Sequence, residues 1–190
     1  MYSVGPKIMI RTGFLAACLA LLVSACASKP ALPPPSQTVP DISLDGLWTQ
    51  QSTTRRDEAG RVLDAIVVPH DRRKPVRIAS RSAPGEAARV FLESGKQLKI
   101  TQTESGLFIS FDRSVVETYT FGELRLVKVG PIVAQRSTGW EGNALVVKTL
   151  DEEGALLTET YRVQQNVLTR SIRLVHKNDE KLNYRQVFVR

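Results

Sequence analysis

The chain has very few of the residue types on which disulfide scaffolds and many enzymes depend. It contains 190 residues but only 2 cysteines, Cys18 and Cys26, and both lie within the first 26 positions. The remainder of the chain therefore has no disulfide, no cysteine-based zinc site and no cysteine nucleophile. A fold built from that remainder depends on its hydrophobic core alone.

Histidine is equally scarce, with His70 beside Asp71 and His176 beside Lys177. Side chains adjacent in sequence seldom converge on one point, and general acid–base catalysis needs a partner within hydrogen-bond reach. The sequence also lacks a Gly-x-Ser-x-Gly elbow, a His-Glu-x-x-His motif, a P-loop and a dinucleotide-binding glycine pattern. These absences predict a protein without catalytic residues, metal or cofactor.

Aromatic residues are also few, with 6 Phe, 4 Tyr and 2 Trp. They do not alternate with basic residues in the way that is typical of single-strand binders, so no nucleic-acid partner is expected.

The hydrophobic run from Phe14 to Ala25 holds only a dozen residues, whereas about 20 are needed to cross a bilayer core. Lys7 and Arg11 precede the run, and small residues end it. This three-part order is typical of an export signal, so residues 1–25 are predicted to be a signal peptide.

The stretch Val23-Ser24-Ala25-Cys26 resembles the lipobox of bacterial lipoproteins. The resemblance implies that Cys26 becomes the first mature residue and carries diacylglycerol and a fatty acid. Two or three acyl chains, at about 0.8 kcal/mol per buried methylene, anchor a protein firmly to a membrane. Ala27 stands where retained inner-membrane lipoproteins carry Asp, which favours the periplasmic face of the outer membrane. The alternative is an ordinary signal peptide cleaved after Ala25, which would leave a free thiol.

The composition is basic, with 26 Lys and Arg against 19 Asp and Glu. Loss of Lys7 and Arg11 leaves 24 basic residues and a formal charge of about +5. The densest cluster is predicted to bind anionic lipid, an acidic envelope protein or cell-wall polymer, and the alternative is a solvated loop. Its members are Arg72, Arg73, Lys74, Arg77 and Arg81.

Residues 27–40 include five prolines. Together with Cys26 they form a predicted lipidated tether, 26–40. As polyproline II at about 3.1 Å per residue, it would span roughly 40 Å. The alternative is a disordered leader without a spacing role. Residues 41–190 are long enough for one domain with a proper core.

Short alternating segments separated by Gly, Asn and Asp turns dominate the second half of the chain. Such short turns exclude parallel pairing and predict an all-β fold, an antiparallel meander of about 8–9 strands. Closure into a calycin-like barrel would remove the exposed edges, and the alternative is a two-layer sandwich. One short helix is expected over 84–94, with Ser82 as its cap and Gly95 at its end. The predicted strands are 97–103, 107–112, 115–121, 124–129, 132–140, 143–150, 155–163, 167–175 and 182–190.

Two resemblances support a β-barrel. Gly46-Leu47-Trp48 is similar to the Gly-x-Trp that opens lipocalin and other calycin barrels. In those barrels an arginine near the chain end packs on the indole, which implies Arg190 or Arg185 here. The alternative is a core tryptophan that follows a turn.

Residues 95–190 resemble an uncharacterised family of exported bacterial β-proteins. The motifs, in chain order, are "LKITQT", "VVETYTFGE", "STGWEGNALVVKT", "LTETYRV" and "NVLTRSIRL". The resemblance implies a fold but no activity. Since this chain lacks a His-rich loop before the Glu-x-aromatic strand, no metal is implied either.

Glu159 shares a strand face with Leu157 and Tyr161, so alternation turns its carboxylate inward. A buried carboxylate needs a cation, and Arg170 or Arg136 is expected to supply it. Glu159, Tyr161 and Arg170 then form either a polar anchor in a ligand cavity or an internal ion pair.

Two classes of function follow from these features. The first is an outer-membrane lipoprotein that acts as an envelope interaction or assembly module. The alternative is lipocalin-like binding of a small apolar or amphipathic molecule. A solidly packed interior favours the first, and a cavity lined by Glu159, Tyr161 and Arg170 favours the second.

Overall fold

The computed structural model describes residues 1, 31–51, 85 and 87–190. Cys26, most of the predicted signal peptide and the basic cluster lie outside the described residues. In the part that is described, no helix is long and apolar enough to cross a membrane.

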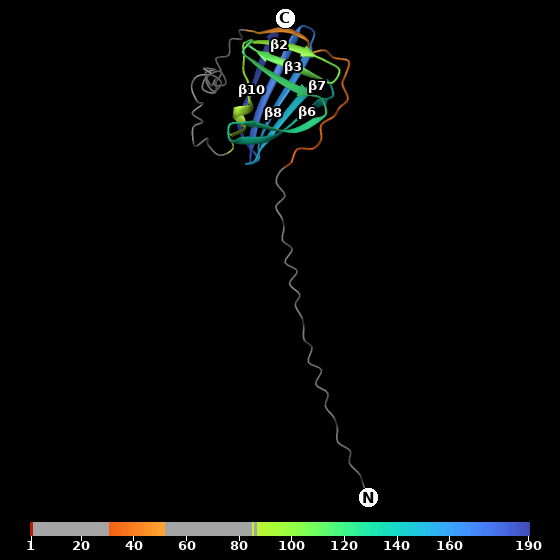
Figure 1. Ribbon diagram of the computed structural model, residues 1–190, viewed down its shortest axis with the longest axis vertical. Helices are drawn as coiled ribbons and strands as arrows, with labels where there is room; N and C mark the ends of the chain where they lie inside the picture. Colours follow the sequence, from red (N-terminus) through yellow and green to blue (C-terminus); the bar gives the residue numbers. More distant parts are fainter. Residues whose placement is uncertain (2–30, 52–84, 86) are drawn as a thin grey trace.

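The described chain is almost entirely β-structure, as predicted (Figure 1). Ten strands form one sheet in the order β4-β3-β2-β1-β10-β9-β8-β7-β6-β5. Every neighbouring pair is antiparallel, so the predicted meander is confirmed. The strands are β1 (Gly46–Gln50), β2 (Gln97–Gln102), β3 (Gly106–Phe111), β4 (Val115–Thr120), β5 (Glu123–Val129), β6 (Ile132–Glu141), β7 (Ala144–Asp151), β8 (Ala155–Gln164), β9 (Val167–His176) and β10 (Asp179–Val189).

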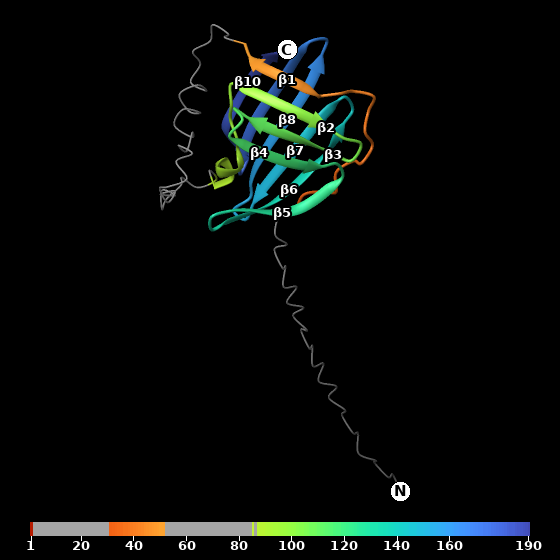
Figure 2. The ribbon, with the colours of Figure 1, turned by 45° about the horizontal axis from the view of Figure 1, so that its top comes forward.

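The sheet curls into a nearly closed barrel instead of a sandwich (Figure 2). Closure comes from β1, which pairs with β2 on one side and with β10 on the other. β4 and β5 stand at the two ends of the strand order and form no ladder with each other. The gap between these two strands is the one place in the described sheet where backbone hydrogen bonds do not continue the wall.

Alternation along the strands fills the interior, as β8 illustrates. Ala155, Leu157, Glu159 and Tyr161 are buried, and the residues between them are more accessible. Two hydrophobic clusters result. One contains Trp48, Phe111, Trp140, Tyr161 and Phe188, and the other lies beneath the short helix and includes residues of it.

The expected helix over 84–94 is shorter than predicted and is a 3-10 helix, η1 (Ala87–Phe91). Gly85 has a φ of +81°, which a right-handed helix cannot include. Leu92 donates its N–H to the carbonyl of Arg89 over 3.0 Å, the tighter spacing of a 3-10 turn. η1 packs against β7 and β8 and buries Ala88 and Phe91 against the second cluster.

Residues 31–40, here named the strap, lie against the outside of the barrel. Leu32 is buried, and its N–H donates to Oε1 of Gln135 over 3.1 Å. A Cβ added to Gly139 would lie 2.8 Å from Cβ of Pro35, so the two segments are in close contact. This part of the predicted tether therefore does not extend away from the domain.

Contacts around Trp48 join the start of the described domain, near β1, to its last residue, Arg190. The indole Nε1 donates to the carbonyl of Leu44 over 2.9 Å. The expected arginine on the indole is Arg190, whose guanidinium lies 4.5 Å from the ring centroid. Arg190 also donates to the carbonyl of Asp45 over 2.7 Å.

Arg190→Ala should lower the free energy of unfolding by about 1 kcal/mol, because the cation–π contact and a charged hydrogen bond are both lost. Urea denaturation followed by tryptophan fluorescence measures the change. The control is Arg185→Ala, since Arg185 is exposed and makes a 3.3 Å hydrogen bond to Thr169. Equal losses in the two variants would contradict a specific role for Arg190.

Candidate functional site

A cleft of about 300 Å³ lies where the barrel wall is incomplete. η1 and the residues just after it form one side, and β4, β5 and β6 form the others. The lining residues are Val90, Phe91, Glu93, Glu117, Arg125, Leu126, Val127, Lys128, Val129 and Arg136. The cleft is therefore bounded by aliphatic and aromatic side chains and by five charged ones.

Arg136 connects the cleft to the barrel interior. Its side chain is 4% exposed, and Nη1 lies 2.8 Å from Oε2 of Glu117. Nε donates to Oγ1 of Thr149 over 3.2 Å, and Nη2 donates to the carbonyl of Phe91 over 3.4 Å. The guanidinium also lies 5.7 Å from the ring centroid of Phe91 and 5.8 Å from that of Tyr119. One side chain thus joins η1, β4, β6 and β7.

The electrostatics keep this arginine charged. Burial alone would lower the pKa of the Arg136 guanidinium, but the nearby carboxylates Glu117 and Glu159 raise it above its ordinary value. Burial raises the pKa of Tyr119, and the charge of Glu159 adds to that shift. Arg136 is consequently cationic and Tyr119 neutral throughout the range in which proteins function.

Arg125 and Lys128 provide further positive charge on β5. Arg125 donates to the carbonyl of Thr118 over 2.8 Å and lies 3.6 Å from the carboxylate of Glu123. The first contact joins β5 to β4 through a side chain at the point where no ladder exists. Because Arg125 is partly accessible, it can also bind an anionic group in the cleft.

Glu159, Tyr161 and Arg170, the residues selected from the sequence, are brought together inside the barrel. Both Nε of Arg170, at 3.0 Å, and Nη2 donate to Oε2 of Glu159. The Tyr161 hydroxyl donates to the same oxygen over 3.0 Å. Arg170 donates further to Gln186 over 3.2 Å and to the carbonyl of Glu93 over 2.8 Å.

This group is an internal ion pair, and it does not line either described cavity. The side chains of Arg170 and Glu159 are 0% and 2% exposed. The rings of Phe111 and Tyr161 lie 5.1 and 5.4 Å from the Arg170 guanidinium and complete its surroundings. Burial opposes the charge of Arg170, but Glu159 raises the pKa of the guanidinium, and burial raises that of the Tyr161 hydroxyl.

Sequence reasoning missed the cleft. The signal that could have indicated it is the pattern of β5, "ELRLVKV", in which exposed Leu124 and Leu126 lie on the same face as Lys128 and flank Arg125. Such a strand does not bury a complete apolar face, which is typical of an edge.

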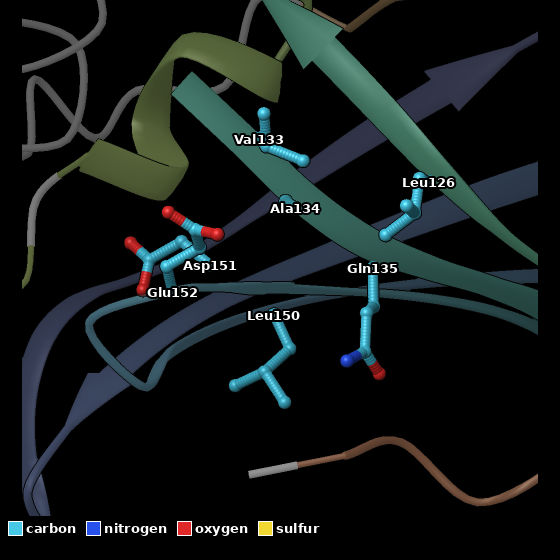
Figure 3. Close-up of a pocket in the computed structure, with 7 residues that line it drawn as sticks. All are labelled: Leu126, Val133, Ala134, Gln135, Leu150, Asp151 and Glu152. Atoms are coloured by element: carbon cyan, nitrogen blue, oxygen red, sulfur yellow. The ribbon is translucent and has the colours of Figure 1, made fainter. Parts of the chain in front are cut away.

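A smaller depression of about 70 Å³ lies beside β5, β6 and β7 (Figure 3). Figure 3 shows Gln135 and Leu150 pointing toward the side on which the strap runs. The remaining lining residues are Leu126, Val133, Ala134, Asp151 and Glu152.

The described residues contain no group of three or more His, Cys, Asp or Glu that could hold a metal ion. His176 is buried, and its Nε2 lies 3.2 Å from the carbonyl of Glu153. His70 lies outside the described residues.

Comparison with known proteins assigns no family. No family model and no curated protein matches the chain. A secretory abundant heat soluble protein from Ramazzottius varieornatus is similar in structure, with a TM-score of 0.48 and 12% identity over 77% of this chain and 94% of that one. A point mutant of the fatty acid transporter REP1-NXSQ gives a TM-score of 0.43 and 14% identity over 77% of this chain and 97% of that one. The site is therefore interpreted from its own residues.

Arg170→Met should cost about 3–5 kcal/mol of unfolding free energy, because Glu159 is left charged and buried without its cation. The double variant Glu159→Gln/Arg170→Met should lose less than half as much, since no unpaired charge remains. Urea denaturation measures both. The control is Arg173→Met on the same strand, where the 2.7 Å pair with Glu180 is exposed and its loss should change the free energy of unfolding far less. A double variant no more stable than Arg170→Met would contradict this account.

Proposed function

We propose that this chain is a non-catalytic binding protein for a small amphipathic molecule that carries an anionic group. The ligand sits in the cleft between β4 and β5, with its apolar part toward η1 and its charged group toward the arginines. The observation that carries the proposal is the combination of an apolar wall and basic side chains in one cleft of about 300 Å³. That volume lies at the lower end of the range for small-molecule sites, roughly 300–1,000 Å³.

The apolar wall supports the affinity part of the proposal. Val90, Phe91, Val127 and Val129, from η1 and β5, line the cleft with apolar side chains. A hydrocarbon segment between them removes apolar surface from water, which is worth about 25 cal/mol per Å². A segment of a few carbons fits a cleft of this size better than a long chain buried whole.

The charges support the sign of the ligand. Three cations, Arg125, Lys128 and Arg136, line the cleft together with two carboxylates, Glu93 and Glu117. Arg136 is buried and already paired with Glu117 at 2.8 Å. The more accessible cations of the cleft are therefore Arg125 and Lys128 of β5. An anionic head group there completes a charge-assisted contact that a neutral head group does not make.

Arg125→Glu should weaken binding of a dansyl-labelled medium-chain fatty acid about tenfold, which corresponds to about 1.4 kcal/mol. Fluorescence titration of the non-acylated form carrying Cys26→Ser measures this. The matched control is Arg162→Glu, an exposed arginine on β8 outside the cleft, which makes the same change in net charge. Equal weakening in both variants, or no saturable binding in the parent, would contradict the proposed site.

We further propose that acyl chains on Cys26 hold the barrel at the periplasmic face of the outer membrane. The support is the lipobox-like sequence before Cys26. The anchor and the cleft are compatible, because the first lies at the chain terminus and the second lies in the barrel wall.

Labelled palmitate should enter the wild-type chain and be absent from Cys26→Ser, because the thiol is the only acceptor for diacylglycerol in this mechanism. The matched control is Cys18→Ser, which removes the other thiol within the predicted signal peptide and should leave incorporation unchanged. Incorporation that persists in Cys26→Ser would rule out this anchor.

The filled interior favours a second candidate, an envelope interaction or assembly module. The ion pair of Glu159 and Arg170 occupies the position where a central ligand cavity would be. In that case the outer surface carries the function, together with the basic cluster at 72–81. The same titration distinguishes the candidates, since a module of this kind binds no fatty acid in the cleft.

A further inference from the structure

The strap is fitted to the barrel by two glycines. A Cβ on Gly139 of β6 would lie 2.6 Å from the carbonyl oxygen of Ser36, and one on Gly122 would overlap Cγ of Gln37. At both positions the strap occupies the space of a side chain. In Figures 1 and 2 this orange segment follows the outside of the barrel as far as the end of the barrel near β5.

The strap also covers apolar side chains on the outer face of the sheet. Leu145 and Val147 belong to the inner core, so alternation turns Val146 outward, as it does Leu150. Val146 and Leu150 are nonetheless only 7% and 8% exposed, and they belong to neither core cluster. Leu32 is buried on the same side, where its N–H is held by Gln135. The strap is thus a packed part of the domain.

This packing shortens the link between the domain and an acyl chain on Cys26. Cys26 lies five positions before Ala31, and at about 3.5 Å per position this stretch reaches no farther than roughly 17 Å. Ala31 precedes Leu32, which is bound to Gln135, and Gln135 pairs across the ladder with Leu126 of β5. A lipid on Cys26 is therefore confined to the neighbourhood of β5.

The outer face of β5 carries exposed apolar side chains at this position. Leu124 and Leu126 are 44% and 71% exposed, and Lys128 follows them on the same face. β5 ends the strand order, so its edge has no ladder partner in the described sheet. Aliphatic side chains beside a lysine suit the boundary between acyl chains and anionic head groups.

We propose that the outer face of β5, namely Leu124, Leu126 and Lys128, rests against an anionic phospholipid bilayer, and that the strap fixes this orientation. The proposal depends on the acylation of Cys26 proposed above. Arg125, Val127 and Val129 of the same strand line the cleft, and Leu126 and Lys128 stand at its rim, so the mouth of the cleft opens beside the lipid surface.

The test uses the full acylated protein in vesicles of phosphatidylethanolamine and phosphatidylglycerol that contain a nitroxide-labelled lipid. Cys26 is then blocked, so Leu124→Cys gives a single site for a fluorophore. The matched control is Phe108→Cys, because Phe108 of β3 is also exposed and is equally accessible at 44%. We expect severalfold stronger quenching by the lipid nitroxide at position 124. Equal quenching at the two positions would overturn the proposal.

A second pair of variants tests the strap. Gly139 is not one of the described glycines with a positive φ, so the backbone of β6 can accept a valine there. The valine side chain of Gly139→Val would nonetheless displace Ser36 and Pro35 of the strap. Gln135→Leu removes the acceptor for Leu32 without adding bulk at the contact. Both should reduce quenching at position 124 toward the level at position 108, with palmitate incorporation unchanged. Undiminished quenching in both variants would overturn the role of the strap.

The outcomes separate this inference from the functions on which it rests. Absence of palmitate would refute the anchor, and with it the orientation. Palmitate incorporation with equal quenching at positions 124 and 108 would refute the orientation alone. The fatty acid titration in the non-acylated form is independent of both.

Discussion

The incomplete ladder between β4 and β5 is the constraint on which the rest of this structure depends. Everywhere else in the described barrel, backbone hydrogen bonds join neighbouring strands. Across the gap, side chains form the hydrogen bonds instead. Arg136 donates to the carboxylate of Glu117, and Arg125 donates to the carbonyl of Thr118. A wall made of side chains leaves space that a ladder does not, and η1 covers that space with apolar groups. The cleft and the charged side chains that line it therefore both result from the missing ladder between β4 and β5.

The buried arginines occupy the centre of the barrel together with the acceptors that they require. Each guanidinium needs several acceptors once it is removed from water, and those acceptors must converge from different strands. Around Arg170 they are Glu159, Gln186 and the carbonyl of Glu93. The polar layer separates the two hydrophobic clusters and joins three neighbouring strands, β8, β9 and β10, to the segment that follows η1.

Much of this fold could be predicted from alternation and turn chemistry, because both are local. The strand positions, the antiparallel order and the inward direction of Glu159 all depend on residues within a few positions of one another. The cleft depends on which two strands remain unpaired and on where Phe91 packs, and these are long-range facts. The length of η1 depended on the backbone at Gly85. Likewise, the prolines of residues 31–40 indicate an extended chain, but the surface that receives it requires Gly139, about a hundred residues away in sequence.

The pairing of β1 with β10 has a consequence for how the molecule forms. Thr49 lies opposite Val189, so the barrel cannot close until nearly the whole chain is available. Contacts between such distant residues form slowly, because the entropy of a large loop is lost before any closing contact is gained. Such a chain stays open during synthesis. That delay suits the export that the proposed acyl anchor on Cys26 requires, in which an unfolded polypeptide passes through a translocation channel before it assembles.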